Sequence, residues 1–78
     1  MHISEVIINL YTKYGGYKSV FSFYYSNIYP NNYELAKTVS ENTCTLIDNY
    51  LNENEKCKKD LIMKELKYNI SNELKSIK

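Results

Sequence analysis

Apolar side chains recur every three or four residues through the second half of the chain. One face of residues 33–51 collects Leu35, Ala36, Val39, Thr43, Leu46, Ile47 and Tyr50. In residues 56–77 the same spacing aligns Ile62, Leu66, Ile70, Leu74 and Ile77. This period places apolar side chains on one face of an α-helix. The polar sequence NENE, residues 52–55, separates the two segments, so the pattern predicts a long helical hairpin.

The first segment of the chain predicts a shorter helix over residues 3–14. Ser4 is placed to cap its N-terminus, and Gly15–Gly16 supplies the left-handed stop that many helices use. One face of this helix collects Ile3, Val6, Ile7, Leu10 and Tyr14.

The aromatic run SVFSFYYS, residues 19–26, allows two interpretations. As a strand it mixes serine and aromatic side chains on both faces, and the chain has no second strand-like segment to pair with it. As a helix it places Ser19, Ser22 and Ser26 in one narrow polar stripe. The rest of the helical surface is a wide apolar arc that contains Tyr17, Val20, Phe21, Tyr24, Tyr25 and Ile28. We therefore expect a helix over residues 18–28, whereas a strand would need a partner from a second chain.

Four helical segments predict an all-α fold: a small four-helix bundle-like domain over residues 1–78, with two short N-terminal helices and a long C-terminal helical hairpin. The hydrophobic content of 44% is enough for a core. No apolar run approaches the roughly 20 residues that span a bilayer, and the N-terminus lacks the features of a signal peptide. We expect a cytoplasmic protein, of the cell or of an infected host cell.

Candidate catalytic and metal-binding groups are few. His2 is the single histidine and lies at the chain terminus, and no serine or cysteine has a base placed beside it. Two cysteines and one histidine give no metal-ligand spacing, so we expect no enzyme activity, no metal and no cofactor. On the predicted hairpin, Cys44 and Cys57 are offset too far for a disulfide, which predicts two free thiols.

The charge composition bears on nucleic acid as a partner. All ten basic residues are lysine, and the net charge is only +1. Lysine lacks the planar fork with which arginine reads guanine, so base-specific DNA recognition is disfavoured, although the lysine-rich last helix leaves phosphate contact open. Residues 34–51 faintly resemble a helix-turn-helix, but Ser40 replaces the usual turn glycine and Glu41 the apolar residue after it. One continuous helix explains the same residues.

A second stripe follows the last predicted helix on the side away from Leu66. It contains Cys57, Leu61, Lys64 and Tyr68. These residues either belong to a wide core face or form a contact surface, because tyrosine and apolar anchors with a lysine rim suit a protein interface. The nine tyrosines also favour a contact surface, since so many large rings do not fit the interior of 78 residues.

These features predict a small non-catalytic protein-binding module whose partner is another protein, with a homodimer as one form. The abundance of Lys, Asn, Ile and Tyr without arginine is typical of an A/T-rich viral or mobile-element genome. The predicted role is an inhibitor or adaptor that occludes a partner surface. The alternatives are a small helix-turn-helix-like DNA-binding regulator and a structural component of a larger assembly.

Overall fold

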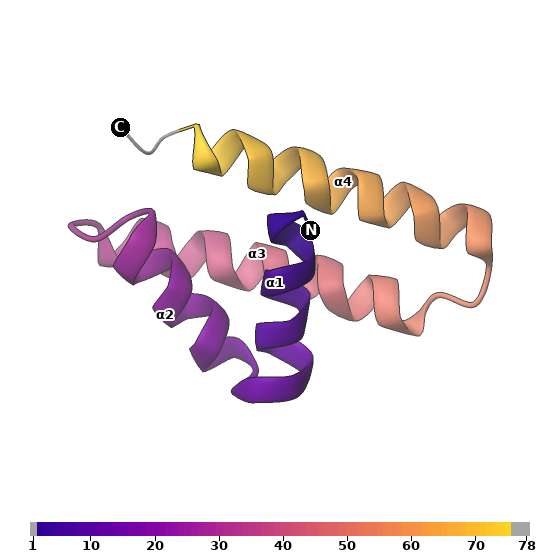
Figure 1. Ribbon diagram of the computed structural model, residues 1–78, viewed down its shortest axis with the longest axis horizontal. Coiled ribbons are helices and arrows are strands. Elements are labelled where there is room, and N and C mark those ends of the chain that lie inside the picture. The colour runs from indigo at the N-terminus through magenta and orange to yellow at the C-terminus, as the bar shows by residue number, and fades with distance from the viewer. Residues whose placement is uncertain (1, 76–78) are drawn as a thin grey trace.

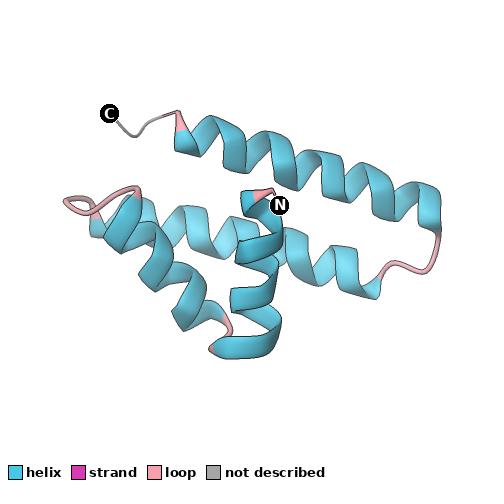
Figure 2. Cartoon of the chain, viewed as in Figure 1, coloured by secondary structure: helices cyan, strands magenta, loops and turns pink. Residues whose placement is uncertain are grey.

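The computed structural model describes residues 2–75, in which helices are joined by short loops and no strand occurs (Figure 2). The elements are α1 (Ile3–Asn9), the π-helical segment η1 (Leu10–Tyr14), α2 (Tyr17–Asn27), α3 (Tyr33–Asn52) and α4 (Lys56–Leu74). The all-α fold with two short N-terminal helices and a long C-terminal hairpin is thereby confirmed. Ile77, predicted to extend the inner stripe of the last helix, lies outside the described residues.

The long hairpin of α3 and α4 is covered by the other helices over only part of its length (Figure 1). α2 packs along the N-terminal part of α3, and α1 crosses the hairpin and contacts α4. The end that carries the loop Glu53–Glu55 projects beyond α1 and α2. The hairpin therefore has one covered end and one open end.

All four helices or their termini contribute to one buried cluster. Its members are Ile7, Val20, Tyr24, Ile28, Ala36, Cys44, Ile47, Leu66 and Ile70. Leu66 and Ile70 confirm the inner stripe predicted for α4. Leu35 was predicted on the core face of α3 but is 40% exposed. The buried face of α3 is centred on Ala36 and Ile47, and Leu35 is rotated from Ala36 by about 100°, which turns it to solvent.

The boundaries of the first helical segment differ in part from the prediction. His2, not Ser4, is the N-cap: its Nδ1 accepts a hydrogen bond from the Ser4 backbone N–H at 3.0 Å, and Ser4 itself is buried. The predicted stop is present. Gly16 has a φ of +62°, which favours glycine, and a side chain at Gly15 would collide with Ser19. Both glycines are needed for the tight passage from η1 into α2.

The SVFSFYYS run is helical, which confirms the interpretation based on the helical wheel. Ser22 and Ser26 are exposed, whereas Val20 and Tyr24 are fully buried. The apolar arc of α2 is wider than the surface that the other helices cover. Tyr17, at the start of the helix, and Tyr25, at one edge of the arc, remain exposed to solvent.

A polar contact joins three helices inside the covered end. The Tyr24 hydroxyl of α2 donates to Glu73 Oε1 of α4 at 2.8 Å and lies 3.2 Å from Thr43 Oγ1 of α3. Burial raises the pKa of Tyr24, and burial also raises the pKa of the Glu73 carboxyl, an effect that the hydrogen bond from Tyr24 partly opposes. Tyr24 can be fully buried because its hydroxyl has these partners.

Candidate functional site

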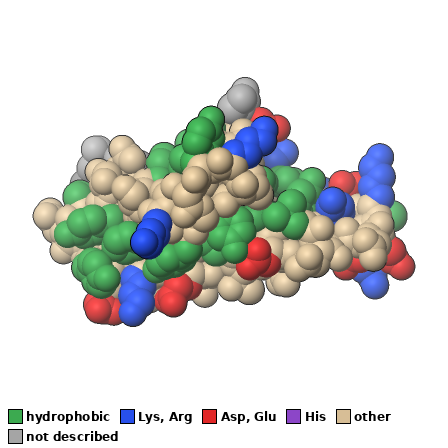
Figure 3. Space-filling view, turned by 90° about the horizontal axis from the view of Figure 1, so that it is seen from below, with side chains coloured by type: hydrophobic (Ala, Val, Ile, Leu, Met, Phe, Trp, Pro, Cys, Tyr) green, Lys and Arg blue, Asp and Glu red, His purple; other side chains and the backbone are tan. Residues whose placement is uncertain are grey.

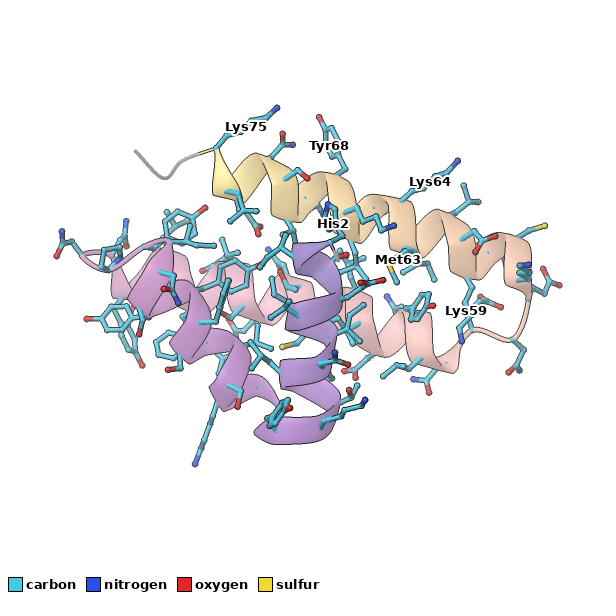
Figure 4. All side chains as sticks on the ribbon, in the orientation of Figure 1. His2, Lys59, Met63, Lys64, Tyr68 and Lys75 are labelled. Carbon is cyan, nitrogen blue, oxygen red and sulfur yellow. The ribbon has the colours of Figure 1, made fainter. Side chains whose placement is uncertain are left out.

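The outer α4 face, defined as Cys57, Leu61, Lys64 and Tyr68, points away from the bundle. Leu61 is 63% exposed and Tyr68 68% exposed. On the helical wheel these residues centre about 180° from the buried Leu66, and Figure 4 shows Lys64 and Tyr68 directed away from the other helices. The interpretation of this stripe as a wide core face is therefore wrong. Its role in binding stays a prediction.

A second exposed apolar surface lies on α2 and the start of α3. This aromatic face consists of Tyr17, Phe21 and Tyr25 of α2 with Tyr33 of α3. The Phe21 ring stacks between the rings of Tyr17 and Tyr25, at centroid distances of 6.1 and 5.6 Å. Tyr33 meets Phe21 and Tyr25 edge to face, at 5.3 and 6.0 Å. The four rings form one continuous cluster.

Local sequence explains how the aromatic face is assembled. Tyr17, Phe21 and Tyr25 follow at intervals of four residues, which places them in one row along α2. The turn at Pro30 reverses the chain, and Tyr33 then begins α3 beside the end of this row. In the view of Figure 3, hydrophobic side chains gather over the α2 side with charged side chains along its lower edge, and further charged side chains lie at the open end of the hairpin.

The rings of the aromatic face are only partly shielded. Phe21 is half-buried at its centre, while Tyr25 is 38% and Tyr33 is 55% exposed. Partial burial raises the pKa of Tyr17, and the nearby negative charge of Glu41 raises it further. The Glu41 carboxylate is therefore close enough to act on the Tyr17 hydroxyl. Apolar centres with a charged rim are typical of protein-contact surfaces.

Sequence reasoning missed the aromatic face as a site, since it placed Tyr17, Phe21 and Tyr25 in one wide apolar arc of the helix without separating its exposed part. A signal was present in the number of tyrosines. Of the nine, only Tyr24 is fully buried, which agrees with the expectation that so many rings exceed the interior. The spacing of four residues could have located the surplus rings on one surface of α2.

Two shallow grooves on the surface are lined by few side chains that could act in catalysis or metal binding. One, of about 330 Å³, lies between Leu10 and the serine stripe of α2, where Phe23 also lines it. The other, of about 340 Å³, is lined by Glu5, Ile8, Asn9, Tyr50 and Met63. Neither set of lining residues contains a histidine or a cysteine, and neither groove pairs a nucleophile with a positioned base.

The two thiols occupy contrasting environments. Cys44 is buried and Cys57 is exposed, and both are free, as predicted. Burial, together with the negative charge of Asp48, raises the pKa of Cys44 to about 11. Within residues 2–75, no three side chains of His, Cys, Asp or Glu type lie together in a way that could hold a metal ion. The helices of the same range are too short or too polar to span a membrane.

α3 is continuous from Tyr33 to Asn52, so the turn that a helix-turn-helix requires near Ser40 is not formed. Ser40 is instead buried on the inner face of one helix. Comparison with protein-family models, curated proteins and solved structures finds no match for this chain.

Proposed function

We propose that this chain is a small non-catalytic module that binds another protein. The observation that carries this proposal is the aromatic face, where three exposed tyrosine rings pack around the half-buried ring of Phe21. Aromatic anchors dominate the binding energy of many protein interfaces. Tyrosine suits such a surface because its ring is buried on contact while its hydroxyl tolerates water when the partner is absent.

The outer α4 face provides a second proposed contact surface. Leu61 and Tyr68 are its large apolar side chains, Cys57 extends it toward the loop, and Lys64 supplies a charge between them. This face and the aromatic face lie on different helices, so a chain that uses both can join two partners. Such an arrangement supports an adaptor, and occlusion of a functional surface on either partner supports an inhibitor.

We propose that this module originates from a virus or mobile element. Its place of action would be inside the cell that the virus or element occupies. The support is compositional: lysine, asparagine, isoleucine and tyrosine are abundant and arginine is absent. Small binding proteins that block a host or defence component would use exposed aromatic anchors without a catalytic site.

The test compares the wild-type chain with a variant of the aromatic face. Tyr25→Ser with Tyr33→Ser removes two exposed rings and should leave the core intact, because neither ring is fully buried. The matched control is Tyr14→Ser, which removes a ring that is 76% exposed and outside the cluster. Tagged forms of all three chains are used to capture proteins from the same cell extract.

The captured protein that matters is one retained by wild type and by Tyr14→Ser and lost with the double variant. That protein is purified, and its affinity for each chain is measured. We expect the double variant to weaken binding by about 2 kcal/mol or more, the scale of hot-spot residues. Equal affinity of all three chains would remove the aromatic face from the proposal.

A further inference from the structure

The outer α4 face has the spacing of a coiled-coil seam. Cys57, Leu61, Lys64 and Tyr68 follow at intervals of four, three and four residues. This alternation is the heptad pattern in which two helices pack along a shared line. The seam lies opposite the buried Leu66, so α4 can pack on the bundle with one face and on another helix with the other.

Charged residues flank the seam in an ordered way. Lys58 and Glu65 lie along one side of it, and Asp60 and Lys67 lie along the other, all exposed. Within residues 2–75 the single ion pair joins Lys58 to Glu55, at 3.6 Å and largely in solvent. Asp60, Glu65 and Lys67 have no ion-pair partner within this part of the chain, so each is available to a second helix.

We propose that the outer α4 face binds the outer α4 face of a second copy of the chain, with the two helices antiparallel. Around a two-fold axis midway between Leu61 and Lys64, Leu61 lies opposite Lys64 of the second copy, and Cys57 lies opposite Tyr68. Lys58 then meets Glu65 on one flank, and Asp60 meets Lys67 on the other. Because of the symmetry each ion pair occurs twice.

Charge complementarity distinguishes this arrangement from a parallel pair. In a parallel coiled coil, a flanking residue such as Asp60, which directly precedes the seam residue Leu61, meets the residue five positions later in the partner helix. That rule would bring Asp60 against Glu65, which repel each other. The antiparallel register instead gives opposite charges at all four flanking contacts. The charges on this face therefore select both the partner, a second copy, and its direction.

Lys64 is the one charged residue of the seam, and its surroundings in the proposed dimer are compatible with a charge. Lys64 can lay its aliphatic stem along Leu61 of the second copy while its ammonium group stays in water. Asp60 precedes it by four residues on the same helix, which places a carboxylate beside the lysine. The seam spans about three helical turns, which is short for a coiled coil, so the dimer should be weak and reversible.

The decisive experiment exchanges charges on the full chain. One variant carries Lys58→Glu and Lys67→Glu, and the other carries Asp60→Lys and Glu65→Lys. Each variant alone should have its dimer weakened by at least about tenfold, since every flanking contact becomes repulsive. An equimolar mixture should associate at least as well as wild type. Sedimentation equilibrium over a wide concentration range measures the self-association of wild type, of each variant and of the mixture.

The matched control is Lys13→Glu with Lys18→Glu, which changes the net charge as Lys58→Glu with Lys67→Glu does, at exposed positions away from α4. It should self-associate as wild type does, and circular dichroism checks that every variant is folded. A wild-type chain that stays monomeric at the highest concentration, or a dimer insensitive to the exchanged charges, would overturn the inference.

Cross-linking tests the direction of the helices. In the antiparallel pair the two Cys57 thiols are separated by eleven residues of helix, about 16 Å along the axis, too far for a disulfide. Tyr68→Cys places a thiol opposite Cys57 of the second copy, so a short bismaleimide should link this variant into dimers and leave wild type as monomer. Efficient linkage of wild type through Cys57 would indicate parallel helices and contradict the register.

The homodimer rests on the proposed function, because that function makes the outer α4 face a contact surface. The two can fail separately. If the exchanged charges have no effect on self-association while Leu61→Lys weakens binding of another protein, this face serves a different partner and the homodimer is wrong. If self-association follows the charges and the aromatic-face variant binds as wild type does, the homodimer stands and the proposed role of the aromatic face is lost.

Discussion

The two ends of the α3–α4 hairpin differ in what covers them. At the covered end, α1 and α2 complete a core in which Ile47, Leu66 and Ile70 have no exposed surface. At the open end no residue from Asp48 to Glu65 is fully buried. Where this stretch begins, η1 still contacts it, since the Tyr11 hydroxyl donates to Asp48 Oδ1 at 2.9 Å. Nearer the loop the two helices contact each other, as where Lys59 Nζ lies 4.7 Å from the Tyr50 ring centroid. Stability should therefore concentrate at the covered end, which leaves the open end and its outer surface free to contact partners.

The largest expected effect comes from comparing two variants in which a leucine of α4 is replaced by lysine, one on the buried face and one on the outer face. Leu66→Lys places a charge in the fully buried core and should cost at least about 3–5 kcal/mol, enough to unfold so small a domain. Leu61→Lys falls on the outer α4 face and should change the free energy of unfolding by less than about 0.5 kcal/mol. Thermal melts at low protein concentration give both values. An equally severe loss for Leu61→Lys would mean that the open end belongs to the core.

How much of this division could be predicted from the sequence depends on the kind of feature. The long helices were predictable because their period is a local property: Ile62, Leu66 and Ile70 recur every four residues. The helical state of SVFSFYYS was predictable for the same reason. The cap was not, because His2 and Ser4 both lie at the start of the helical pattern and only the backbone geometry decides between them.

It was harder to predict which apolar side chains remain exposed, because exposure depends on which helices pack together. Periodicity placed Tyr25 and Val20 in one apolar arc, but Val20 is fully buried whereas Tyr25 is 38% exposed. The outer α4 face was identified from its spacing, while the aromatic face needed Tyr33, a residue from another helix. A site built from one helix can be read from the sequence, whereas a site built across a turn requires the fold.

The thiols provide a second comparison of the ends, with a smaller effect. Cys44 lies at the covered end, where its pKa of about 11, raised from 9.0, reduces the thiolate fraction about a hundredfold at neutral pH. Cys57 is exposed near the loop of the open end. We expect one thiol to react rapidly with Ellman's reagent and the other to react at least about a hundredfold more slowly, until denaturant exposes it. Cys57→Ser should abolish the fast phase, and persistence of that phase would contradict the assigned environments.

The smallest effect concerns a carboxyl group of the covered end. Burial raises the pKa of Glu73 above its ordinary value of 4.5, so the folded chain holds this proton more tightly than the unfolded chain does. The contribution of Glu73 to stability is therefore complete below pH 4.5 and is lost as the pH rises through the raised value. Because the side chain is partly exposed, the loss should stay below about 1 kcal/mol.

Urea unfolding of three variants between about pH 4 and pH 8 isolates this contribution. Glu73→Gln keeps an acceptor for the Tyr24 hydroxyl but cannot titrate, so it should remove this part of the pH dependence. Tyr24→Phe deletes the hydrogen bond that lowers the Glu73 pKa, so it should move the loss of stability to higher pH. The control is Glu65→Gln, the same change at an exposed position of the same helix. If Glu65→Gln alters the pH dependence as much as Glu73→Gln does, burial at the covered end is not its cause, and the contrast between the two ends does not extend to their carboxylates.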